Sequence, residues 1–152
     1  MTNAIRPETV ADEILKLERS ALDRWGAGDP AGFLELYAED VTYFDPLTAR
    51  RIDGQQAMTD YYQPWIGKIQ IPRYELLNPQ VVIEGDLALL TYNLVNYLFD
   101  EKGSEAIGSQ WNSTVAYRRR GGEWKTVHSH WSFTRHPAFQ ELTPASSEGL
   151  ES

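Results

Sequence analysis

The chain has 152 residues and a formal net charge of −8. Its length suits one domain, and its charge repels the phosphates of nucleic acids, so we expect no nucleic-acid partner. It has no cysteine, which excludes disulfides, thiolate metal sites and a cysteine nucleophile. With no long apolar run and no signal-peptide pattern, we expect no membrane partner and a cytoplasmic location.

A first helix is predicted to begin at Thr9 and to stop at Gly26. Thr9 is a residue type that caps helix N-termini, and Asp12 stands where a capping box has its acidic partner. Apolar residues then recur at steps of three and four, which gives one apolar stripe: Val10, Ile14, Leu17, Ala21, Leu22 and Trp25. Residues 1–8 are predicted to form a flexible tail.

Two shorter helices and a strand follow. Asp29-Pro30 is typical of a helix start, and a third helix is predicted at roughly residues 55–65. Between them, residues 41–45 are mostly β-branched or aromatic, which predicts a short strand that ends at Pro46.

The second half of the chain predicts an antiparallel meander. Its connectors are short and rich in glycine and aspartate, which makes neighbouring strands antiparallel. The strands are predicted at roughly residues 73–84, 87–99, 108–120 and 123–135. Residues 137–152 turn polar and predict a second flexible tail, which leaves a single domain over residues 9–136.

Helices that precede a meander indicate the α+β fold class. Long strands joined by tight turns must twist and coil, and the apolar stripes of the helices need a surface to cover. We therefore expect a cone-shaped domain, in which three N-terminal helices pack in the concave face of a strongly curved antiparallel sheet. The mouth of such a cone is a natural ligand pocket.

Several stretches resemble the nuclear-transport-factor-2-like superfamily, also called cystatin-like or SnoaL-like. They include LYAEDVT at residues 36–42 and FDP at residues 44–46. Within that superfamily, YRRRGGEWK at residues 117–125 and VHSH at residues 127–130 resemble the association domain of calcium/calmodulin-dependent protein kinase II. The resemblance covers about residues 10–136.

The resemblance implies the cone fold and self-association, as a homodimer or a larger ring. It does not imply kinase activity, because the chain has none of the kinase motifs. The association domain carries arginines on the inner faces of its long strands. Two of those positions hold Val115 and Trp131 here, and a third falls near Leu94 or Val95, which implies a more apolar ligand.

Asp45 is the candidate catalytic residue. In ketosteroid isomerases of this superfamily, an Asp-Pro pair at the end of the first strand carries the general base, and Asp45-Pro46 stands at that position. Such a carboxylate moves a proton next to a carbonyl. The resemblance is incomplete, because Ala21 replaces the oxyanion-hole tyrosine and residues 108–120 contain no aspartate. The alternative is that Asp45 caps a turn, so whether the chain is an enzyme stays open.

His128 and His130 share one face of their strand. A metal site needs at least a third ligand, and no known metal-binding spacing accompanies them. We therefore expect no metal and no cofactor. Hydrogen bonds across the sheet or at a subunit interface are the simpler interpretation.

The inner faces of the last strands predict an aromatic pocket, because alternation there mixes tryptophan with serine, whereas a plain core is fully apolar. Core packing remains the alternative. The predicted ligand-binding residues are Tyr43, Tyr62, Trp65, Asn93, Trp111, Ser113, Val115, Ser129 and Trp131.

The opposite face of the same strands carries short polar and imidazole side chains, which suit a self-complementary dimer interface: Asn112, Thr114, Arg118, Thr126, His128, His130 and Ser132. The sequence thus predicts a free-standing, homodimeric, association-domain-like protein that binds a small hydrophobic or carbonyl-containing molecule. The alternative is a small cyclase, isomerase or dehydratase that uses Asp45 as general acid/base.

Overall fold

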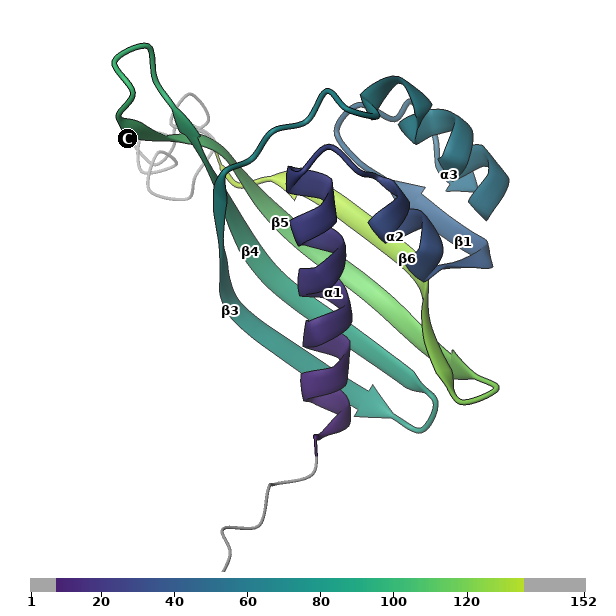
Figure 1. Cartoon of the computed structure of the whole chain (residues 1–152). Coiled ribbons are helices and arrows are strands. Elements are labelled where there is room, and N and C mark those ends of the chain that lie inside the picture. The colour runs from purple at the N-terminus through teal and green to yellow at the C-terminus, as the bar shows by residue number, and fades with distance from the viewer. Residues whose placement is uncertain (1–7, 136–152) are drawn as a thin grey trace, which may run out of the picture.

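The computed structural model describes residues 8–135, and over this range it confirms the α+β architecture (Figure 1). The helices are α1 (Val10–Gly26), α2 (Ala31–Leu36) and α3 (Gln55–Tyr62), the last extended by the 3-10 turn η1 (Gln63–Trp65). The strands are β1 (Tyr37–Phe44), β2 (Ile52–Asp53), β3 (Arg73–Glu84), β4 (Leu87–Phe99), β5 (Glu105–Arg120) and β6 (Glu123–Phe133). Apart from Glu8, the two predicted tails lie outside the described residues.

The start and end of α1 follow from a few local residues. Thr9 and Asp12 form the predicted capping box, in which each side chain accepts a hydrogen bond from the other residue's backbone N–H. Beyond the helix, Gly28 has a φ of +87°, and a Cβ there would lie 3.2 Å from the Cα of Gly67. This close approach brings the segment after η1 against the end of α1, where Ile69 and Ile71 later form part of a cavity wall.

The six strands form one sheet in the order β2-β1-β6-β5-β4-β3. The four long strands pair antiparallel as predicted. One pair differs from the expected antiparallel sheet, because β1 runs parallel to β6, with Tyr43 opposite Ser129. Parallel neighbours need a long crossover, and here the chain supplies it through α3 and the four strands β2, β3, β4 and β5.

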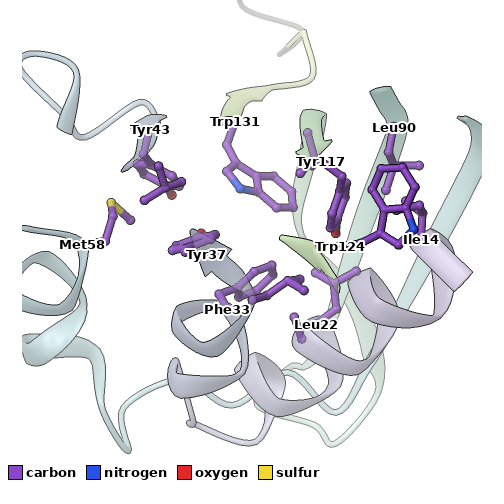
Figure 2. Close-up of a cluster of buried hydrophobic side chains, with 14 of the residues drawn as sticks. Ile14, Leu22, Phe33, Tyr37, Tyr43, Met58, Leu90, Tyr117, Trp124 and Trp131 are labelled. Carbon is purple, nitrogen blue, oxygen red and sulfur yellow. The ribbon is translucent and has the colours of Figure 1, made fainter. Parts of the chain in front are cut away.

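The helices lie on one face of this sheet (Figure 1), and the hydrophobic core fills the space between them. Ile14 and Leu22 of α1 lie on the same side of the sheet as Tyr117 and Trp124 (Figure 2), and all four are buried. Register shifts interrupt the ladders between β3 and β4, β4 and β5, and β5 and β6. Bulges of this kind bend strands and increase their twist, which curves the sheet around the helices.

One bulge moves a residue that was predicted on the outer face. The register of β5 and β6 shifts between Ala116 and Tyr117, so that Tyr117 pairs with Thr126 while Ala116 pairs with His128. Thr126 therefore faces the core, where it is 1% exposed. The prediction that Thr126 belongs to the polar outer face is wrong, because strict alternation does not hold across a bulge.

Candidate functional site

A cavity of about 210 Å³ lies at the end of the cone where α1, α3 and η1 meet the sheet. More than half of its lining residues are aromatic: Trp25, Phe33, Tyr43, Tyr61, Tyr62, Trp65, Tyr74, Trp111 and Trp131. The rest are five aliphatic residues, Leu22, Leu47, Ile69, Ile71 and Leu94, and the polar pair Asp45 and Asn96. Large apolar walls with a few polar groups are typical of small-molecule sites.

Six of the ten residues singled out in the sequence come together in this wall. They are Asp45, Tyr43, Tyr62, Trp65, Trp111 and Trp131. Leu94 is also part of the wall, and the family resemblance places a third arginine of the association domain near Leu94 or Val95. The wall is thus apolar at that point.

The other four predicted residues do not line the cavity. Even-numbered residues of β4 such as Leu94 face inward, so Asn93 lies on the opposite face. There its amide donates to Asn112 Oδ1 at 2.7 Å. Ser113, Val115 and Ser129 do face inward, but they are 3% exposed or less and belong to the packed core. The alternation of inward-facing and outward-facing residues along a strand does not tell how deep in the cone a residue lies.

Sequence reasoning omitted several wall residues. Tyr61 carried a signal, since it neighbours Tyr62, a predicted ligand-binding residue, in the helix that was predicted at roughly residues 55–65. Asn96 stands at an even-numbered, inward-facing position of β4, but no residue pattern in the sequence marks it as part of the cavity wall. Ile69 and Ile71 belong to the irregular segment between η1 and β3, where no periodicity indicates a direction.

Asp45 is both a turn residue and part of the cavity wall, so neither sequence interpretation excludes the other. Its Oδ1 accepts a hydrogen bond from the Leu47 N–H at 2.7 Å, as in an Asx turn. Its Oδ2 accepts from the hydroxyls of Tyr43 at 2.9 Å and Tyr61 at 2.7 Å. Three donors thus converge on one carboxylate, whose two oxygens act here as acceptors.

The two phenols remain donors at neutral pH. Burial, together with the hydrogen bond to Asp45 and its negative charge, raises the pKa of Tyr61. Burial raises the pKa of Tyr43 well above its usual value, with neighbouring Tyr62 and Tyr37 adding to the effect. Behind them, the hydroxyls of Tyr37 and Tyr62 lie 2.9 Å apart and hydrogen-bond to each other. The Asp45 end of the cavity is therefore held by a connected layer of tyrosines.

A polar link and ring contacts fix the opposite wall. Ser109 Oγ accepts from Trp111 Nε1 at 2.9 Å and from Asn96 Nδ2 at 3.1 Å. The ring of Trp111 meets that of Trp131 edge to face, with centroids 5.9 Å apart and planes at 86°. Tyr92 meets the other side of Trp131 in the same way at 5.9 Å. Such packing holds the indoles in place before any ligand arrives.

A second carboxyl lies in the core and was not singled out from the sequence. Glu18 of α1 is 1% exposed, and the hydroxyls of Tyr92 and Tyr117 both donate to it. Burial raises the pKa of Glu18, and the two phenol hydrogen bonds oppose that rise. A signal existed, because Glu18 stands four residues from both Ile14 and Leu22, inside the apolar stripe.

The two histidines lie on the outer face of β6, and the ring of Phe44 contacts both, with centroids 5.8 Å from His128 and 5.2 Å from His130. His128 Nδ1 is 2.7 Å from Thr42 Oγ1, and burial and neighbouring His130 lower the pKa of His128.

Within residues 8–135, no three His, Asp or Glu side chains gather closely enough to hold a metal ion. No helix in that range has the length and apolar character needed to cross a membrane.

The comparison with known families agrees with the motifs. The SnoaL-like domain family matches residues 19–136 of this sequence. The chain belongs to that family. This SnoaL-like chain is 32% identical to a proposed ketosteroid isomerase of Parabacteroides distasonis, with 91% of this chain and 97% of that chain covered and a TM-score of 0.75.

Association domains are also similar to this SnoaL-like chain. The association domain of calcium/calmodulin-dependent protein kinase II from C. elegans shares the fold, with 22% identity, 79% of this chain and 92% of that chain covered, and a TM-score of 0.67. The delta subunit of the same kinase from Oryctolagus cuniculus is 26% identical over 121 residues, which is 78% of this chain. The chain spans only 22% of that subunit's length.

Proposed function

We propose that this SnoaL-like protein is a self-associating binding protein whose cavity holds a small, mostly apolar molecule. The cavity carries this proposal. Its volume of about 210 Å³ exceeds that of the engineered cavity, roughly 150 Å³, that admits benzene. Its wall offers ring faces for stacking and a single carboxylate for one polar group, which is the pattern of a small-molecule site.

The mouth of the cavity supports binding of a ligand from solvent. Leu47 is 68% exposed and Trp65 is 38% exposed, and both belong to the cavity wall. Each square ångström of apolar surface that a ligand covers contributes about 25 cal/mol. Ligand binding would therefore cover apolar surface that the free protein leaves in water.

A neutral fluorescent probe tests this function directly. N-phenyl-1-naphthylamine emits strongly in apolar surroundings, and we expect saturable emission when it is titrated into the protein. Ile71 lines the mouth and is half-buried, so Ile71→Trp adds bulk there without opening the core. The variant should abolish the saturable signal. Equal signals from both proteins, or no saturation with the wild type, would contradict the proposal.

Self-association is supported by the face of the sheet that no helix covers. Val82 of β3 and Leu89 of β4 lie directly opposite each other and are 52% and 43% exposed, next to Leu87 at 45%. Exposed apolar side chains on adjacent strands are typical of interaction surfaces. The short polar residues of β5 and β6 continue this surface, which suits a twofold contact with a second copy.

A second function, proton transfer on a carbonyl compound with Asp45 as general acid/base, is favoured by two observations. The Asp45 carboxylate lines the cavity, and the sequence is 32% identical to a proposed ketosteroid isomerase. Such an enzyme also needs a donor for the developing oxyanion. Three candidate donors on the inner face of the sheet are already engaged, because Tyr43 donates to Asp45, Tyr92 to Glu18 and Trp111 to Ser109. For that reason binding is the preferred function.

The enzyme alternative predicts that 5-androstene-3,17-dione is converted to its conjugated enone, seen as growth of ultraviolet absorbance. The conversion should disappear in Asp45→Asn, which keeps the shape of the side chain and removes the base. Conversion by the wild type alone would make this protein an isomerase. Absence of conversion would leave the binding function standing.

A further inference from the structure

The charge of the cavity wall is one-sided. Asp45 is the only acidic residue among the lining residues, and no arginine, lysine or histidine accompanies it there. Asp45 also takes part in none of the ion pairs found within residues 8–135. A half-buried carboxylate is costly when no cation compensates its charge. Within residues 8–135, the cavity wall therefore has a negative charge that no cation of the protein pairs with.

The rings near this carboxylate pack against one another at tilted or edge-to-face angles, and together with it they line the cavity. Tyr43 lies 5.9 Å from Tyr61 with planes at 54°, and 6.0 Å from Tyr62 with planes at 85°. Trp25 meets Tyr62 at 5.0 Å and 61°. Faces of tryptophan and tyrosine attract cations, and rings arranged as a cage around a site recognise alkylammonium groups.

The hydrogen bonds at Asp45 fix it as an acceptor. Both phenols and the Leu47 N–H point their protons at the carboxylate, so its oxygens act as hydrogen-bond acceptors. An anionic ligand would meet this charge with no cation among the described wall residues, and the net charge of −8 would repel it before contact. A ligand with a positive charge is attracted both by the Asp45 carboxylate and by the net negative charge of the protein.

We propose that the ligand of this cavity is an organic cation, an alkyl- or arylammonium compound whose charged nitrogen lies at Asp45 among the tyrosines and whose apolar body lies against Trp111 and Trp131. The inference rests on the proposed binding function and adds the ligand's charge. The volume of about 210 Å³ limits this ligand to a small molecule.

Two probes of one shape and a third of comparable size separate the effect of charge from that of size. Benzyltrimethylammonium carries a permanent positive charge, neopentylbenzene is its neutral carbon isostere, and 3-phenylpropanoate is an anion of comparable size. Four of the five tryptophans line the cavity, so tryptophan fluorescence reports binding of all three. We expect the cation to bind at least about tenfold more tightly than the isostere, and the anion to bind most weakly.

Two aspartate variants locate the charge effect. Asp45→Asn should weaken benzyltrimethylammonium by about tenfold and leave neopentylbenzene unchanged. Asp60→Asn makes the same change in net charge at an exposed residue of α3 outside the cavity wall, and both affinities should stay at the wild-type value. Thermal unfolding of each variant checks that it is folded.

The outcomes distinguish the inference from the function on which it rests. If the isostere binds as tightly as the cation, or Asp60→Asn weakens the cation as much as Asp45→Asn does, the cationic ligand is refuted while the binding cavity stands. If neither these probes nor N-phenyl-1-naphthylamine binds, both proposals fail. The comparison of the three probes on the wild type decides the matter even if Asp45→Asn does not fold.

Discussion

Replacing Glu18 with glutamine should change how the stability of this protein depends on pH. Glu18 is 1% exposed, and its partners are the hydroxyls of Tyr92 and Tyr117. Glutamine keeps the shape of the side chain and one carbonyl acceptor, and its amide can donate to the oxygen of the other tyrosine. The substitution therefore removes the ionisable group with little loss of packing.

The sign follows from the direction of the pKa shift. Burial raises the pKa of Glu18 in the folded protein, so the folded state holds this proton more tightly than the unfolded chain does. The stability contributed by Glu18 is fully present below the unfolded pKa of about 4.3. It is lost as the pH rises through the folded pKa, at up to about 1.4 kcal/mol of unfolding free energy for each pH unit. Glutamine has no such loss.

The difference between the two proteins isolates this effect. Exposed carboxylates paired with arginines, such as Asp40 and Glu105, have a lowered pKa, so their contribution to the free energy of unfolding grows as the pH rises. This contribution is the same in both proteins and cancels in the difference. Urea unfolding is measured from about pH 4 to about pH 8 at one protein concentration. The free energy of unfolding of the glutamine variant should increase relative to that of the wild type as the pH rises. A difference that is constant with pH would refute the account of Glu18 as an acid held neutral by burial.

Two further variants test the outer face and the cavity wall. His128→Glu combined with His130→Glu places negative charge on the outer face and should dissociate dimers in sedimentation velocity, whereas Ile66→Glu, at a residue 53% exposed elsewhere, should not. A double variant that stays dimeric would place the interface on another surface. Trp131→Leu should weaken N-phenyl-1-naphthylamine by about tenfold and leave the dimer intact. Trp124→Leu, which removes a core tryptophan outside the cavity, should cost stability but not affinity, and equal loss of affinity in both would mean that Trp131 acts only as core.

The order of the helices and of the four long strands could be predicted because their signals are local, whereas β2 was not predicted and β1 begins four residues before its predicted range. The capping box at Thr9 is four residues long, and the ends of β3 and β4 coincide with the predicted ranges. Strand β5 begins at Glu105, three residues before the prediction, because Asp100 accepts from Lys102 and Ser104 and tightens the turn. The chain needs fewer connector residues than the glycine pattern suggested.

The parallel pairing of β1 with β6 and the faces of residues near bulges depend on contacts far apart in the sequence. Thr42 and His128 become neighbours only when the sheet forms. The bulge next to Tyr117 turns Thr126 inward, and no residue type near it marks the change. The sequence predicted a cavity at the mouth of the cone. It did not show that Ser113 lies deeper than this cavity, in the packed core, because depth also depends on contacts between residues far apart in the sequence.

Asp45 and Glu18 show why residue type alone does not identify a binding carboxylate in this fold. Each accepts hydrogen bonds from two tyrosines, so their immediate chemistry is similar. Glu18 is sealed beneath α1, where burial raises its pKa and favours the uncharged acid. Asp45 follows the end of β1, where a backbone N–H adds a third donor and the carboxylate borders the cavity. The ladder positions of the surrounding strands decide which acid borders the cavity, and only the folded chain contains that information.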